Sequence, residues 1–370
     1  MKLRTVAIVI LALAAAVSCQ SRRRQVSIPL VREILQDKSG REYQLISASS
    51  ELNPQGEIVI IGSERAVTIL SETMATIDVR DNVDGSFGSD GLPDFAGETI
   101  ACIIDTTGRP EELMFADEAS LEMAEFRRFF LNGFINALDT LYHETPFDLE
   151  GIGRKIPAKM IVPADPILTD LIKYDVDTLF SALGSKVHIV APVDELSASI
   201  LNSRPGHDVM AAVMHDPMFD NSDIYVHRFK DNASAAGLFG SSVCSLPTPG
   251  NAENLFTAFL DEYAGAGYSR PINVIAVADI GVDFEAFKSD YASSMSILSE
   301  DSAKYSKYLA KDFSFISSLE IIVARCYDTL RADNIFTHNI TDPQIVTYYC
   351  YPDPQDRFVS FLVPASYVQN

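Results

Sequence analysis

The feature that most constrains the fold of this chain is the alternation of short apolar runs with amphipathic segments after residue 98. The alternation predicts right-handed βαβ units, because strand-length runs that are apolar on both faces are typical of parallel strands covered by helices. We therefore expect an α/β fold with doubly wound, mostly parallel sheets. The expected strands are 99–105, 159–163, 187–192, 208–214, 223–229 and 272–279, and the expected helices are 119–142, 167–183, 195–202, 233–243, 253–263 and 284–295.

The length of 370 residues exceeds one ordinary core, so we expect two lobes. The sequence assigns 98–215 to the first lobe, 216–312 to the second, and 313–370 to a segment that completes both, with late strands at 345–350 and 358–363. Residues 26–97 are expected to form an N-terminal extension, with strand-like runs at 43–46 and 57–61 and a helix at 64–75.

A loop rich in Gly and Asp, 81–94, is expected to mark the boundary of that extension. Its acidic spacing is similar to that of a calcium loop that starts at Asp81, but Leu92 stands at the twelfth position, where such a loop needs glutamate. A flexible turn is therefore favoured over a calcium site.

The first 19 residues resemble the signal peptide of a bacterial lipoprotein. Lys2 and Arg4 precede an aliphatic run, 6–17, that is too short to span a bilayer, and Cys19 ends a lipobox-like tetrapeptide. We expect residues 1–18 to be removed and Cys19 to be acylated, so that residues 19–25 tether the protein to a membrane of the bacterial envelope. Gln20 favours the outer membrane by the same resemblance. An ordinary signal peptide, with Cys19 incidental, is the alternative.

The charge of the chain excludes one class of partner. There are 51 acidic and 29 basic side chains, a net charge of −22, and such a body repels nucleic acid. Among the later cysteines, Cys102 lies in an apolar run and is expected to be buried, whereas Cys326 and Cys350 are the more plausible disulfide pair in an exported protein.

Polar side chains follow several of the expected strands, at the edge where ligands bind in open parallel sheets. Any one of them could be an ordinary helix cap, but together they predict a binding crevice. Asp105 and Asp279 would accept hydrogen bonds and Thr106 would donate one. The candidate ligand-binding residues are Asp105, Thr106, Thr107, Asp165, Asp194, His215, Asp216 and Asp279.

No catalytic motif accompanies these residues. Asp105 ends a strand as in haloacid-dehalogenase-like phosphatases, but Thr107 stands where that family needs a second aspartate. The sequence has no Walker loop, no G-x-S-x-G, no G-x-G-x-x-G and no H-E-x-x-H. His207, His215 and His227 lie on separate expected elements, so neither a metal nor a cofactor is expected.

The order of elements at 208–244 is the most specific pattern. A strand gives way to the loop 215–221, a second strand at 223–229, Asp231-Asn232 and an alanine-rich helix, and 251–297 fits a following unit. This order resembles the crossover of type I periplasmic binding proteins. The resemblance implies two lobes that close by a hinge on a sugar, nucleoside or amino acid.

The functional expectation is therefore an envelope lipoprotein that binds a small polar ligand in a cleft between the lobes, more plausibly without turnover. An exported hydrolase with a carboxylate base and a structural or assembly lipoprotein with an envelope protein partner are the alternatives. The sequence does not name the ligand.

Overall fold

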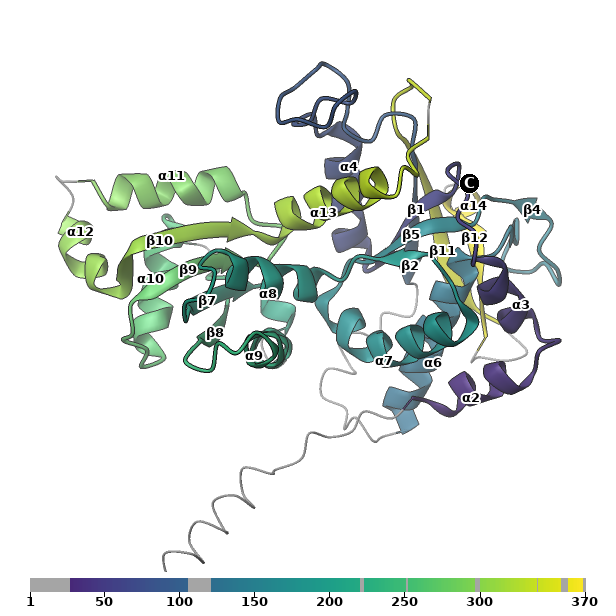
Figure 1. Cartoon of the computed structure of the whole chain (residues 1–370), viewed down its shortest axis with the longest axis horizontal. Helices are drawn as coiled ribbons and strands as arrows, with labels where there is room; N and C mark the ends of the chain where they lie inside the picture. Colours follow the sequence, from purple (N-terminus) through teal and green to yellow (C-terminus); the bar gives the residue numbers. More distant parts are fainter. Residues whose placement is uncertain are drawn as a thin grey trace, which may run out of the picture.

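The computed structural model describes residues 27–105, 121–219, 223–250, 252–296, 300–337, 339–353 and 359–368. These residues form two α/β domains, each built on its own sheet (Figure 1). The coarse expectation of an α/β fold with mostly parallel sheets is thereby confirmed. None of the helices in these ranges combines the length and the apolar character needed to cross a membrane.

The first domain contains a six-stranded sheet in the order β12-β11-β2-β1-β5-β6. All neighbouring strands are parallel except β11 and β12, which are antiparallel. The strands are β1 (Glu57–Gly62), β2 (Thr99–Asp105), β5 (Ala158–Pro163), β6 (His188–Ile189), β11 (Gln344–Pro352) and β12 (Ser360–Pro364).

Helices cover both faces of this sheet, which explains why β1 and β5 are buried along their whole length. Ile58 and Ile60 pack against α4 (Glu64–Thr76) and α13 (Ser318–Ala332). Val59 and Ile61 point to the opposite face, whose core also contains residues of α6 (Leu121–Ala137) and α7 (Pro166–Leu183). Two short helices, α2 (Pro29–Gln36) and α3 (Arg41–Ala48), add Val31, Ile34 and Ile46 to that second core.

The second domain has a four-stranded parallel sheet in the order β10-β9-β7-β8. Its strands are β7 (Met210–His215), β8 (Ser242–Pro247), β9 (Ile272–Val277) and β10 (Leu309–Ser317). One face packs on α8 (Pro192–Asn202) and α9 (Ile224–Ala235). The other face packs on α10 (Leu255–Gly265), α11 (Phe284–Ser294) and the segment around α12 (Glu300–Tyr305).

The chain crosses between the domains twice. It leaves the first domain after β6 and enters α8, and it returns from β10 directly into α13 (Figure 1). The second domain is thus inserted into the first. The first crossing lies between β6 and α8, earlier than the boundary expected at residue 215, because β7 belongs to the second sheet.

Residues 26–97 do not form an extension of their own. β1 lies between β2 and β5 inside the first sheet, so the segment that precedes the 81–94 loop is part of the first domain. The run at 43–46 lies in helix α3, where only Ile46 is buried. The short run at 57–61 and the helix at 64–75 occur as expected, as β1 and α4.

The expected strand at 223–229 is wrong, because these residues begin α9. Ile224, Tyr225, Arg228 and Phe229 are buried, and their spacing of one, four and five residues places them on one helical face. The helix expected at 233–243 is replaced by the end of α9 and the start of β8. Neither Asp194 nor any other side chain caps α8, whose N-cap is Ala191.

The 81–94 loop is held by its own carboxylates. Asp81 accepts hydrogen bonds from the backbone N–H groups of Val83 and Asp84, and Asp90 accepts from those of Asn82 and Leu92. Aspartates in such turns stabilise the backbone locally. Within the ranges that the structure describes, no three His, Cys, Asp or Glu side chains gather in a way suited to a metal ion.

The four later cysteines are buried thiols that form no disulfide with one another. The expected disulfide between Cys326 and Cys350 is wrong, since Cys326 lies in α13 and Cys350 in β11, in the cores on opposite faces of the first sheet. Cys102 is a buried strand residue, as expected. Cys19 and the residues 1–25 around it lie outside the described residues.

Candidate functional site

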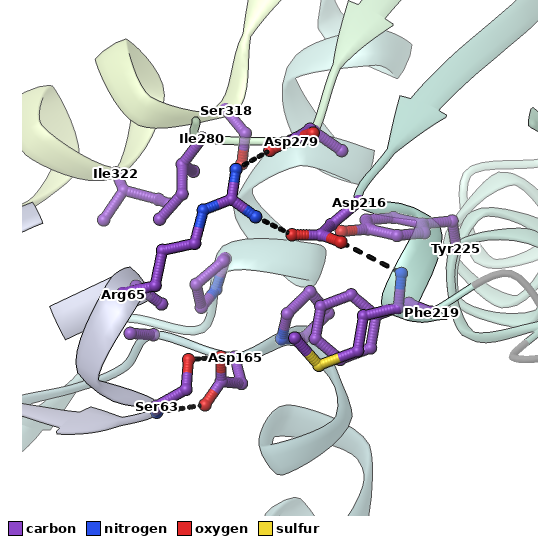
Figure 2. A pocket seen from close by; sticks show the side chains of 16 residues that line it. Ser63, Arg65, Asp165, Asp216, Phe219, Tyr225, Asp279, Ile280, Ser318 and Ile322 are labelled. Carbon is purple, nitrogen blue, oxygen red and sulfur yellow. Dashed lines mark hydrogen bonds and ion pairs between the residues drawn. The ribbon is translucent and has the colours of Figure 1, made fainter. Parts of the chain in front are cut away.

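A pocket lies between the two domains, where the carboxyl ends of β1 and β5 face those of β7 and β9 (Figure 2). Loops that follow parallel strands place their polar groups at this edge. The free cavity measures only about 40 Å³, room for a few water molecules. Its polar lining comprises Ser63, Arg65, Asp165, Asp216, Tyr225, Asp279 and Ser318.

Arg65 crosses the pocket from the first domain to the second. It projects from the first turn of α4 and forms ion pairs with Asp216 and Asp279, the latter with 3.5 Å between Nη2 and Oδ1 (Figure 2). The side chain is 55% exposed, so these pairs are screened by solvent. Gly281 leaves room for the guanidinium, because a Cβ at that position would lie 2.0 Å from Arg65 Nη2.

Asp165 faces the pocket from the loop after β5. Both of its oxygens are bound by Ser63, whose backbone N–H donates to Oδ2 at 2.5 Å and whose hydroxyl donates to Oδ1 at 2.7 Å (Figure 2). Gly62 permits this approach, since a Cβ there would lie 2.7 Å from Asp165 Oδ2. The end of β1 therefore fixes a carboxylate that belongs to the end of β5.

The second domain contributes two more carboxylates. Asp279 follows β9 and accepts hydrogen bonds from the Thr248 hydroxyl at 2.9 Å and from the Gly281 N–H at 2.9 Å. Asp216 follows β7 and accepts from the Met218 N–H at 2.9 Å. These bonds fix the two carboxylates independently of Arg65.

Tyr225 lies on α9 and is buried among these charges. Burial raises the pKa of its phenol, and the carboxylates of Asp279, Asp216 and Asp165 raise it further. The phenol therefore keeps its proton and acts as a hydrogen-bond donor. Asp165, Asp216 and Asp279 line the same pocket as Tyr225.

Three of the candidate residues predicted from the sequence thus meet in one pocket, namely Asp165, Asp216 and Asp279. His215 is buried behind it, with Nδ1 2.9 Å from the Asp216 carbonyl oxygen and its ring stacked near that of Tyr225. Asp194 does not line the pocket and pairs instead with Arg228, at 2.7 Å. Asp105 ends β2, but its side chain lies outside the description, as do Thr106 and Thr107.

The sequence prediction missed Ser63, Arg65 and Tyr225. Ser63 and Arg65 directly follow β1, so the same strand-end rule identifies them once β1 is counted in the sheet. Tyr225 was missed because residues 223–229 were expected to form a strand, whereas they begin helix α9. None of the four described cysteines lines this pocket.

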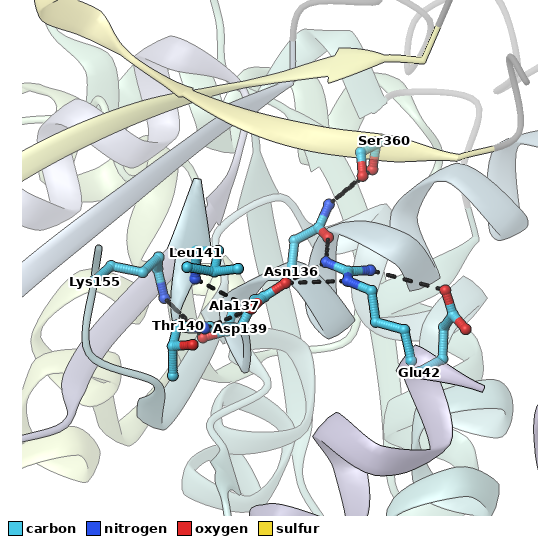
Figure 3. A network of polar contacts seen from close by, with 9 residues as sticks. Glu42, Asn136, Ala137, Asp139, Thr140, Leu141, Lys155 and Ser360 are labelled. Carbon is cyan, nitrogen blue, oxygen red and sulfur yellow. Dashed lines mark hydrogen bonds and ion pairs between the residues drawn. The ribbon is translucent and has the colours of Figure 1, made fainter. Parts of the chain in front are cut away.

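A second polar network lies at the C-terminal end of α6 and lines no part of the pocket (Figure 3). Asn136 donates to the carbonyl oxygen of Ser360 at 2.7 Å, and Arg41 donates to Asn136 at 3.0 Å and pairs with Asp139. Lys155 donates to the Ala137 carbonyl oxygen at 3.0 Å. These contacts join α3, α6 and β12, so we assign the network a structural role.

Comparison with known proteins gives a remote likeness of fold. No protein-family model and no curated protein matches the chain. Solved structures that match include glutamate racemase RacE1 from Bacillus anthracis, at 13% identity over 80% of this chain and 89% of that chain, with a TM-score of 0.49. Glutamate racemase from Francisella tularensis, in complex with D-glutamate, matches at 13% identity over 80% and 88%, with a TM-score of 0.45. The enzyme from Campylobacter jejuni matches at 12% over 81% and 94%, with a TM-score of 0.41.

These matches contradict the resemblance to type I periplasmic binding proteins, which rested largely on the wrong strand at 223–229. The expected function as a ligand-binding receptor depended on that resemblance and is wrong with it, as is the hydrolase alternative. Acylation of Cys19 and an envelope protein partner stay predictions. At 12–13% identity the likeness concerns the fold alone, so any function must come from the pocket itself.

Proposed function

We propose that the pocket between the domains is the active site of an isomerase that moves a proton at a carbon atom of a small amino-carboxylate. The observation that carries the proposal is the convergence of carboxylates from both domains on one pocket that also holds a guanidinium and a neutral phenol. Two carboxylates on opposite sides of a bound substrate can serve as proton acceptor and proton donor.

Arg65 is the group that would bind the substrate carboxylate. Its planar guanidinium matches a carboxylate in two parallel hydrogen bonds, and it is the only cationic side chain among the described residues that line the pocket. A substrate carboxylate would replace Asp216 and Asp279 as the partner of Arg65. The two aspartates are then released to bind a positive group.

The charge balance points to a substrate that also carries an ammonium group. Three aspartates surround one arginine, so a ligand with only a carboxylate would add to an excess of negative charge. An amino-carboxylate supplies one charge to each side of the pocket. This pairing is the reason for preferring an amino acid to a simple carboxylic acid.

The proton transfer follows from the same arrangement. Asp165, in the first domain, would accept the proton from the carbon next to the substrate carboxylate, and the electron pair of the broken C–H bond would move onto that carboxylate. Tyr225 would donate a hydrogen bond to the oxygen on which charge develops. Asp279, on the other side of the pocket, would relay a proton from water to the opposite face of the same carbon, and Asp165 would pass the proton it accepted to water. The configuration inverts, and one proton is exchanged with the solvent.

Exchange of the carbon-bound hydrogen tests the proposal. The full-length protein is incubated in D₂O with each common L- and D-amino acid, and loss of the α-proton signal is followed by NMR together with chiral analysis. We expect exchange with inversion for at least one amino acid, and a loss of about 100-fold or more in Asp165→Asn and Asp279→Asn. Glu64→Gln, at an exposed neighbour of Arg65 outside the pocket, is the matched control. Absence of exchange in the wild type with every amino acid, or undiminished exchange in both Asp variants, would overturn the proposal.

A further inference from the structure

A larger cavity lies at the opposite edge of the first sheet, just before β2 and β11 begin. It measures about 480 Å³, far more than the pocket between the domains and within the range of small-molecule sites. The 82–96 part of the loop before β2 forms one wall, and the end of α13 with residues 334–337, 339 and 340 forms the other. We call this cavity the groove.

Asp94 gives the groove a specific chemical character. Its side chain is 97% buried, and Oδ1 accepts hydrogen bonds from the backbone N–H groups of Val79 and Arg80, both at 2.9 Å. Oδ2 has no partner among the residues that the structure describes. This oxygen is not among the fully buried side-chain atoms without a partner, so it is open to solvent at the groove that Asp94 lines, where a ligand can donate a hydrogen bond to it.

The surroundings of Asp94 favour a cation over an anion. The two arginines nearby are already engaged, since Arg331 donates to the Val83 carbonyl oxygen at 3.2 Å and Arg80 pairs with Asp328 at 3.4 Å. More carboxylates than these arginines lie on the loop before β2, namely Asp78, Asp81, Asp84 and Asp90. An anionic ligand would be repelled by this excess of negative charge.

The rest of the lining is mixed and partly open to solvent: the polar residues Asn82, Asn334, Thr337 and Asn339 alternate with apolar and aromatic ones. The rings of Tyr327 and Phe336 lie in the groove with their centroids 5.1 Å apart. Val83 and Ile340 are 88% and 80% exposed, although both are large apolar side chains. Exposed apolar side chains that surround a cavity are typical of binding surfaces, and aromatic rings also attract organic cations.

We propose that the groove is a binding site for an organic amine with an apolar body, whose ammonium group is bound by Asp94 Oδ2. The aromatic rings hold the apolar part, and Val83 and Ile340 cover it from the two walls. The site is separate from the proposed active site, because no residue lines both cavities.

Phenethylamine is a suitable probe, because it combines a primary ammonium group with one aromatic ring. Its affinity for the full-length protein is measured by isothermal titration calorimetry and compared with that of uncharged 2-phenylethanol and anionic 3-phenylpropanoate. We expect Asp94→Asn, which keeps an acceptor for the Val79 and Arg80 N–H groups, to weaken phenethylamine binding about 10-fold or more. Glu72→Gln is the matched control, since Glu72 is an exposed carboxylate on α4 that does not line the groove.

A second variant keeps the test valid if Asp94→Asn does not fold. Val83→Ser combined with Ile340→Ser changes only exposed side chains, and we expect a 3- to 10-fold loss of affinity with an unchanged circular dichroism spectrum. Arg65→Gln should leave the affinity unchanged. No phenethylamine binding at 10 mM, equal affinity for all three probes, or unchanged affinity in both groove variants would overturn the proposal.

Discussion

The buried ion pair between Lys159 and Glu98 offers the sharpest test of the energetics of the first domain. Both side chains are fully buried, with 2.6 Å between Lys159 Nζ and Glu98 Oε2. Lys159 also donates to the carbonyl oxygens of Pro54 and Ile335, at 2.7 and 2.8 Å, and Glu98 accepts from the Thr337 N–H at 2.7 Å. The pair therefore joins β5 to the residue before β2, and both to the loop before β1 and the segment after α13.

Lys159→Met should destabilise the domain strongly, because it leaves the Glu98 carboxylate buried without its counter-charge. Loss of one partner of a buried pair costs about 3–5 kcal/mol, out of a total stability of about 5–15 kcal/mol. For a domain of this size the midpoint of thermal unfolding should fall by about 6–20 °C. Urea unfolding followed by circular dichroism gives the free energy directly.

Combining Lys159→Met with Glu98→Gln should recover part of this loss. The neutral glutamine still accepts from the Thr337 N–H, so the remaining cost is that of the carbonyl oxygens of Pro54 and Ile335, about 1–3 kcal/mol each at most. The double variant should therefore be more stable than Lys159→Met alone. A cost below about 1 kcal/mol for Lys159→Met, or additive costs for the two substitutions, would refute this reasoning.

The pH dependence of Lys159→Met provides a second measurement. Burial raises the pKa of Glu98, and Lys159 opposes that rise. Without Lys159 the folded protein holds the Glu98 proton more tightly than the unfolded chain does. A raised folded-state pKa adds stability at low pH, and this stability is lost as the pH rises through that pKa. The deficit of Lys159→Met relative to wild type should therefore be smaller at pH 5 than at pH 8, and a deficit that grows toward low pH would contradict this assignment.

Three further outcomes are expected. Asp175→Asn should loosen the segment around Ile28, because buried Asp175 binds both the Ile28 N–H at 3.0 Å and Arg127 at 2.8 Å. Hydrogen exchange at the Ile28 amide should accelerate at least tenfold, and an unchanged rate would contradict this role. Cys19→Ser tests the sequence-based prediction that Cys19 is acylated. The variant should move from the detergent phase to the aqueous phase on Triton X-114 partitioning, and equal partitioning of variant and wild type would rule out acylation. Burial raises the pKa of the Cys102, Cys244 and Cys326 thiols, that of Cys244 to about 12. Ellman's reagent should therefore react with these three thiols and with buried Cys350 only on unfolding, and rapid reaction of the native protein would exclude the described packing.

The central strands were predictable because burial on both faces leaves a continuous apolar run, as in 99–105 and 272–279. The edge strand β10 escaped notice because its exposed positions are polar, with Lys311 and Asp312 in the middle. β6 has only two residues, although the sequence favoured a longer strand there. Residues 223–229 show the limit of local pattern, since a segment rich in β-branched and aromatic residues became a helix once packing selected one of its faces.

The strand-end rule found the three aspartates of the pocket because it depends only on the direction of parallel strands. It missed Arg65 because the 81–94 loop separates β1 from β2 in sequence and made β1 look like part of another unit. Pairing of β1 with both β2 and β5 is a long-range fact that no local composition reveals. The positions of the aspartates were therefore predictable from the sequence, whereas the pairing of Asp216 and Asp279 with Arg65 was not.

The groove lies beyond any strand-end rule, because it is assembled at the edge where the strands begin. Its walls come from residues about 250 positions apart in sequence, such as Asn82 and Asn334, which meet only after α13 has packed on the first sheet. Helix α13 also reaches the other site, since Ile322 lines the pocket between the domains and Arg331 lines the groove. Nine residues of helix separate them, about 14 Å. We expect Arg65→Gln to leave the phenethylamine affinity unchanged, because each site binds its ligand independently. A changed affinity would instead show that helix α13 links the two sites.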